Sequence, residues 1–196
     1  MTHSSARLPR TVRPVRTALV AVLAAALGAG AAGCSSPPTR DYAVPDRICG
    51  TDVDPDTLAP LLPTGTEVRA RPGTVSASGA SCGIDVVRED GEKFSPSLRV
   101  RRDAVPDGAD PLEVKKGTLE RYGHPREADI GDGARIADRG ALAVESCPGK
   151  GEDTTFALQV DVLTDTPEKV PERRKALERF VRGYLAAAYE KQGCDA

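Results

Sequence analysis

The chain contains 196 residues, of which 27 are basic and 29 are acidic, and only 4% are aromatic. Four of the basic residues and none of the acidic ones lie in the first 16 positions, so the rest of the chain has a net charge of about −6. A nucleic-acid-binding protein is expected to carry the opposite charge, so we exclude nucleic acid as a partner.

Residues 1–33 have the layout of an export signal. The arginines precede an apolar stretch, residues 17–30, as in a secretory signal peptide. The small residues that follow run into a cysteine, and Ala31-Ala32-Gly33-Cys34 resembles the lipobox of bacterial lipoproteins, with Ala31 where leucine is commoner. The resemblance implies that residues 1–33 are removed and that Cys34 receives a diacylglyceryl group.

Three other interpretations of the leader stay open. An uncleaved transmembrane helix would use residues 17–33, which contain three glycines and lie at the short limit for crossing about 30 Å of hydrocarbon. Ordinary secretory cleavage near residues 29–31 would leave five cysteines, and an odd number leaves one thiol unpaired. The uninterrupted apolar core argues against an amphipathic transit peptide. Acylation of Cys34 fits best because it leaves four cysteines for the folded part.

The mature chain is predicted to have two parts. Residues 34–46 comprise the acylated cysteine and a segment rich in serine and proline, which is typical of an extended tether. Residues 47–196 have a suitable length for one domain.

Helix starts are predicted where a capping side chain precedes a proline, as at Asp54, Asp110 and Thr166. These signals predict helices over residues 55–62, 111–122 and 168–191. Glu113 follows Asp110 by three positions and completes a predicted capping box. Apolar residues recur at three-four spacing in the last helix, which predicts one buried stripe.

Strands are predicted by alternating apolar and polar residues over 82–86, 98–100 and 155–162, with a hairpin signal at Asp90-Gly91. Weaker strands are predicted over 67–71, 134–137 and 141–146. Helices interleaved with runs of strands predict an α+β fold with antiparallel sheet packed by helices. The even spacing of the helix caps leaves open whether two α-β-β-β units precede the long C-terminal helix.

Four cysteines remain for the domain, namely Cys49, Cys82, Cys147 and Cys194. They allow three pairings, and pairing within each predicted unit favours Cys49 with Cys82 and Cys147 with Cys194. No two cysteines are separated by two residues, so structural disulfides are favoured over redox or zinc chemistry, and we expect no metal or other cofactor.

Other polar residues carry weaker signals for chemistry. His124 follows a predicted helix and is expected to be exposed near the helix end. Asp52, Asp54 and Asp56 lack the glycine and glutamate of a calcium loop. Further carboxylates show no recognisable catalytic spacing and are expected on the surface: Asp129, Asp132, Asp138 and Glu145.

Four arginines form the candidate ligand site. Arg69 and Arg71 share one strand parity, as do Arg99 and Arg101. If the two strands are neighbours, both pairs form a positive patch on an acidic domain, which suits an anionic ligand or partner. The alternative is a solvated face neutralised by Glu67 and Asp85.

The layout as a whole resembles the small secreted lipoproteins of actinobacteria. The features that carry the resemblance are the lipobox, the tether, Cys49 before a short helix ending in Leu61-Leu62-Pro63, and Cys82 at the opening of a strand. The likeness covers most of the chain, although only the lipobox is a specific motif. It implies a lipid-anchored position on the outer face of the cytoplasmic membrane and an α+β fold, but no activity.

The leading hypothesis is therefore a non-enzymatic module that binds an anionic ligand or an envelope protein. One alternative is a cell-envelope hydrolase that uses carboxylate catalysis. Another is a regulatory subunit that docks on a membrane protein.

Overall fold

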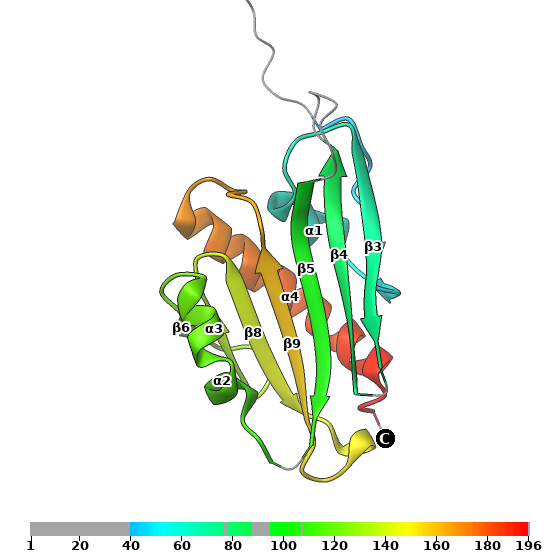
Figure 1. Ribbon diagram of the computed structural model, residues 1–196, viewed down its shortest axis with the longest axis vertical. Coiled ribbons are helices and arrows are strands. Elements are labelled where there is room, and N and C mark those ends of the chain that lie inside the picture. Colours follow the sequence, from blue (N-terminus) through cyan, green and yellow to red (C-terminus); the bar gives the residue numbers. More distant parts are fainter. Residues whose placement is uncertain (1–39, 77, 88–94, 107, 196) are drawn as a thin grey trace, which may run out of the picture. The chain divides into compact units, whose positions relative to one another are not determined.

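A computed structural model describes residues 40–195 except 77, 88–94 and 107 (Figure 1). The leader, Cys34, the first part of the predicted tether and the predicted hairpin turn at Asp90-Gly91 lie outside the described residues.

The described chain is built on a seven-stranded antiparallel sheet with the strand order β3-β4-β5-β9-β8-β7-β6. The strands are β3 (Glu67–Val75), β4 (Gly79–Val87), β5 (Ser95–Val105), β6 (Arg126–Ala128), β7 (Gly133–Ile136), β8 (Gly140–Ser146) and β9 (Thr155–Val162). A two-stranded hairpin of β1 (Arg47–Ile48) and β2 (Thr51–Asp52) lies outside it. The predicted α+β class with antiparallel sheet and a long C-terminal helix is confirmed.

The sheet consists of two meanders that meet at the β5–β9 ladder, which runs from Leu98 opposite Val162 to Val105 opposite Thr155. The first meander has the three strands that were predicted. The second has four, one more than predicted, and the additional strand is β6. This strand is only three residues long, too short for an alternating pattern to be visible. Two equal α-β-β-β units therefore describe the chain only approximately.

Helices cover both faces of the sheet (Figure 1). They are α1 (Pro55–Leu58), the 3-10 turn η1 (Ala59–Leu61), α2 (Pro111–Val114), α3 (Lys116–Arg121), the 3-10 turn η2 (Pro148–Lys150) and α4 (Val170–Gln192). The predicted stripe of α4 is buried in the main core together with α1 and the inner side chains of the sheet. On the opposite face, α2 and α3 cover a smaller apolar cluster around Leu119 and Leu142.

Two of the three predicted helix caps are confirmed. The side chain of Asp54 accepts from the Asp56 N–H (2.9 Å), and that of Asp110 accepts from the Leu112 N–H (2.8 Å). The Glu113 carboxylate, predicted to complete a capping box, binds the Arg135 guanidinium at 2.7 Å.

The third predicted cap is wrong. The helix α4 starts at Val170, with Lys169 at the capping position and Pro171 in the first turn. Thr166-Pro167 lies in the preceding loop and is joined by a cis peptide bond. The helical proline is Pro171, four residues after Pro167, and it carried no signal in the sequence because Val170, which has no capping side chain, precedes it.

The cysteines are joined in the pairs that the sequence favours. Cys49 is bonded to Cys82, with Cα atoms 5.6 Å apart, and Cys147 is bonded to Cys194, with Cα atoms 4.5 Å apart. The first bond ties the β1–β2 turn to β4. The second ties the end of β8 to the segment after α4.

Part of the predicted tether is bound to the domain. The Arg40 guanidinium donates to the Ala59 and Leu62 carbonyls (2.7 and 2.9 Å), and the Tyr42 hydroxyl donates to the Pro63 carbonyl. The boundary at residue 46 therefore lies too late, and the folded part includes residues from Arg40 onward. Tyr42 and Val44 also pack partly against the main core, so this segment is not the free tether that its composition predicted.

Candidate functional site

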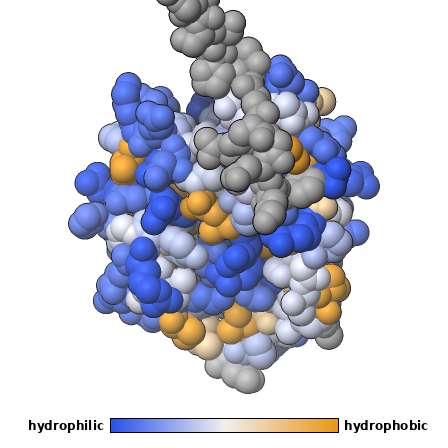
Figure 2. Space-filling view, turned by 45° about the horizontal axis from the view of Figure 1, so that its top comes forward, coloured by the Kyte–Doolittle hydropathy of each residue, from blue (hydrophilic) through white to orange (hydrophobic). Residues whose placement is uncertain are grey.

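The four arginines singled out in the sequence lie on one face of the sheet. Neighbouring residues on the same strands, such as Ile84, Leu98 and Val100, are buried in the core beneath α4. Because side chains alternate along a strand, Arg69, Arg71, Arg99 and Arg101 project from the opposite face, which we call the arginine face. The side of the molecule that carries α2 and α3 is largely hydrophilic, with small separate hydrophobic patches (Figure 2).

The two arginine strands are not neighbours, which was the condition for a single positive patch. The strand β4 lies between them, so β3 and β5 are about 10 Å apart. Arg71 is opposite Gly83, and Gly83 is opposite Arg99, which places the three residues in one row. Gly83 has no side chain, and a Cβ added there would lie 3.2 Å from an Nη atom of Arg71. The Arg71 guanidinium therefore extends over β4 towards the second arginine strand.

Two carboxylates lie beneath this row. Asp85 accepts from Arg71 at 3.1 Å, and Asp161 on β9 accepts from Arg101 at 3.0 Å and lies 4.0 Å from Arg99. The side chains of Asp161 and Asp85 are 0% and 9% exposed, whereas those of Arg71 and Arg99 are 60% and 46% exposed. The negative groups are buried and the positive groups face solvent.

A fourth ion pair completes the arginine face. Arg69 binds Glu67 on the same strand, and both side chains are about half exposed. The expected neutralising residues, Glu67 and Asp85, are thus both present. Four guanidinium groups face three carboxylates, and the best exposed of these carboxylates lies at the edge of the sheet.

Asp161 organises the polar groups around it. The Gln159 amide donates to its second carboxylate oxygen at 2.8 Å. Burial and then the negative charge of Asp161 raise the pKa of Tyr122, which follows α3. Two buried atoms beside Asp161, Arg101 Nε and Gln159 Oε1, have no hydrogen-bond partner among the described residues. This polar cluster fixes the positions of the arginines above it.

The chain matches no protein-family model, no curated protein and no solved structure. What these residues do therefore has to be inferred from their own chemistry.

The arginine face suits a planar anion. A guanidinium presents several N–H donors in a rigid fork that matches carboxylate and phosphate oxygens. Arg71 uses part of this fork on the buried Asp85, whereas Arg99 lies 4.0 Å from the buried Asp161, and both guanidinium groups are largely exposed to solvent. Because the counterions are buried, an approaching anion meets the positive groups first.

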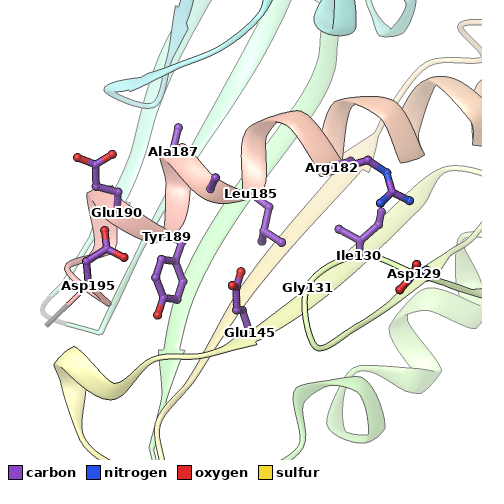
Figure 3. Close-up of a pocket in the computed structure, with 11 residues that line it drawn as sticks. Asp129, Ile130, Gly131, Glu145, Arg182, Leu185, Ala187, Tyr189, Glu190 and Asp195 are labelled. Atoms are coloured by element: carbon purple, nitrogen blue, oxygen red, sulfur yellow. The ribbon is translucent and has the colours of Figure 1, made fainter.

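An open pocket of about 720 Å³ lies between the end of α4 and β8 (Figure 3). Glu145 from β8 and Tyr189 from α4 point into it, and Glu190 and Asp195 line the same end. Burial, followed by the charges of Asp132 and Asp195, raises the pKa of Glu145. Four carboxyl side chains and one basic side chain, Arg182, line the pocket, and this excess of acidic groups disfavours anions.

Sequence reasoning missed this pocket. Glu145 was predicted only as a surface carboxylate, while Tyr189, Glu190 and Asp195 were not singled out. The last turns of α4 reach β8 because the Cys147–Cys194 bond holds them there, and no local pattern predicts that approach.

The remaining sequence candidates are dispersed. His124 is exposed, and its Nδ1 lies 3.5 Å from Asp138, which also accepts from Arg174 at 2.8 Å. Asp132 accepts from the Ser146 N–H at 2.7 Å. Within the described part of the chain, no three His, Cys, Asp or Glu side chains are placed to hold a metal ion. None of the helices described there combines the length and the apolar character needed to cross a membrane.

Proposed function

We propose that the chain is an exported lipoprotein that carries a non-enzymatic binding module on the outer face of the cytoplasmic membrane. Residues 1–33 are removed, Cys34 is acylated, and the α+β domain binds an anionic group of a ligand or envelope protein through the arginine face. The lipobox supports the anchor, and two disulfides suit a domain outside the reducing cytoplasm.

One observation carries the binding proposal: two of the three carboxylates on the arginine face, Asp85 and Asp161, are buried, while the guanidinium groups of Arg71 and Arg99 are exposed. An exposed ion pair contributes little, because water competes for both partners. A guanidinium held by a buried carboxylate is already oriented, so less side-chain entropy is lost when it binds a second anion. Arg71 is held in this way by Asp85, and Arg101 is held by Asp161. Arg99 lies in one row with Arg71, with Gly83 between them, and its guanidinium is 4.0 Å from Asp161.

The test uses the mature acylated protein in neutral detergent micelles, titrated calorimetrically at low salt with pyrophosphate and with polyglutamate. A hydrogen bond to a charged group contributes about 1.5–3 kcal/mol, so the Arg71→Gln/Arg99→Gln double variant is expected to bind at least about tenfold more weakly. The matched control is Arg179→Gln/Arg182→Gln, which removes two exposed arginines from α4. Equal loss in both double variants would show nonspecific charge attraction and overturn the assignment of the face.

Two further measurements separate the proposal from its rivals. Intact-mass analysis of protein isolated from membranes is expected to show the diacylglyceryl group on Cys34, and an unmodified thiol there would overturn the anchor. Peptidoglycan and polysaccharide fragments are expected to stay intact. Turnover that disappears in Glu145→Gln would instead establish the carboxylate hydrolase.

A further inference from the structure

The first described residues of the chain, 40–42, are bound to the domain by specific contacts. Besides the Arg40 hydrogen bonds to two carbonyls, its guanidinium lies 5.6 Å from the centre of the Tyr42 ring. Between these two residues, the Asp41 N–H donates to the Gly65 carbonyl at 2.8 Å. Three successive residues are therefore bound to η1 and to the segment that follows it, and we call this contact the entry clamp.

The entry clamp lies at one end of the sheet. Thr66, next to Gly65, donates its N–H to the carbonyl of Val87, the last residue of β4. The clamp is thus beside the end where β3 begins and β4 ends, which is the upper end in Figure 1. The opposite end contains the β3–β4 turn and the start of β9. With nine residues in β4, the two ends are about 25 Å apart.

The length of chain between anchor and clamp is short. Six residues lead from Cys34 to Arg40, and an extended chain advances by at most about 3.5 Å per residue, so the reach is about 20 Å. This distance is smaller than the length of the sheet along its strands. If residues up to 46 were free, as the composition suggested, the reach would be twice as long.

We infer that the clamped end of the sheet faces the lipid headgroups and stays within about 20 Å of them, with the β3–β4 turn directed away. This inference rests on the proposed acylation of Cys34. The mature chain has a net negative charge, so anionic headgroups repel a domain that lies flat on them. This repulsion favours a domain whose strands point away from the membrane. Arg71 and Arg99 lie four residues, or about 13 Å, from the clamped end of their strands, so the arginine row is about half-way along the sheet.

The experiment measures energy transfer from single dyes on the mature protein to acceptor lipids in vesicles of phosphatidylcholine and phosphatidylglycerol. Thr64→Cys places a dye at the clamped end, and Glu152→Cys places one at the opposite end; both positions are exposed. The dye at residue 64 is expected to transfer more energy, because the dye at residue 152 lies up to about 25 Å farther from the bilayer. Equal or reversed transfer would overturn the inference.

Two controls separate the causes of failure. Flotation of the protein with the vesicles and its intact mass test whether Cys34 is acylated. If the protein does not float or lacks the acyl group, the proposed function fails as well. Arg40→Ala/Tyr42→Phe opens the entry clamp and releases up to six more residues of tether. The difference between the two dyes is then expected to shrink. A difference that stays the same would show that the clamp does not orient the domain.

Discussion

The Arg101 guanidinium lies 3.0 Å from the carboxylate of Asp161, whose side chain is completely buried in the middle of the sheet. The two residues are 60 positions apart and meet because β5 pairs with β9. Their ion pair joins the two meanders and fixes the part of the arginine face that lies on β5. Its removal should therefore affect both stability and binding.

Asp161→Asn is expected to lower the free energy of unfolding by about 1–3 kcal/mol, because it leaves Arg101 with an amide instead of a carboxylate. The estimate is at the lower end for a buried pair, since Arg101 is partly exposed to water. Denaturant titration measures the change. The control is Asp52→Asn, whose ion pair with Arg47 is exposed on both sides and should contribute less than about 1 kcal/mol. Equal stabilities for the two variants would contradict this role.

Removing the Cys147–Cys194 bond by a double change to alanine is expected to lower stability by about 4 kcal/mol, because the bond closes a long loop in the unfolded chain. Removing Cys49–Cys82 should have a similar effect. The two double variants differ at the pocket, since only the first frees the end of α4 from β8. The pKa of Glu145 should therefore fall towards its usual range in the first variant alone, as measured by carboxyl NMR.

Glu145 gives the stability a defined pH dependence. Its pKa is raised in the folded state by burial and by Asp132 and Asp195, so folding favours its protonated form. This contribution is fully present below the unfolded value near 4.5 and is lost as the pH rises through the folded pKa.

Glu145→Gln should therefore stabilise the protein at pH 7 more than at pH 4, measured by unfolding at both values. Glu152→Gln, at an exposed carboxylate, should show no such difference. Asp195→Asn should lower the pKa of Glu145 only in part, because burial is the larger cause. A Glu145→Gln effect independent of pH would contradict the assignment.

Asp138 acts with the opposite sign. Burial raises its pKa, but the hydrogen bond and charge of Arg174 outweigh burial, and the pKa is lowered overall. Its contribution is present above the unfolded value near 3.8 and is lost as the pH falls through the folded pKa.

Arg174→Gln should remove that support and move the midpoint of acid unfolding to higher pH. Arg179→Gln on the same helix is the comparison, because its side chain is exposed. Circular dichroism during acid titration checks both variants. An unchanged midpoint in Arg174→Gln would show that Asp138 draws its stabilisation from elsewhere.

The sequence by itself determined what each element does locally. Alternation along β5 placed Arg99 and Arg101 on the face opposite Leu98 and Val100. The side chains of Asp54 and Asp110 cap their helices by accepting from the backbone N–H two residues later. These features depend on contacts within one element, where the spacing of side chains is fixed by backbone geometry.

Only the tertiary structure decided which elements meet. The carboxylate of Asp161 lies beneath the arginines because two distant strands pair, and the pocket at Glu145 exists because the end of α4 returns to β8. The clamp at Arg40 likewise depends on the carbonyls of Ala59 and Leu62, about 20 residues later in the chain. Such contacts result from the packing of the whole core, so no residue's immediate neighbours in the chain reveal them.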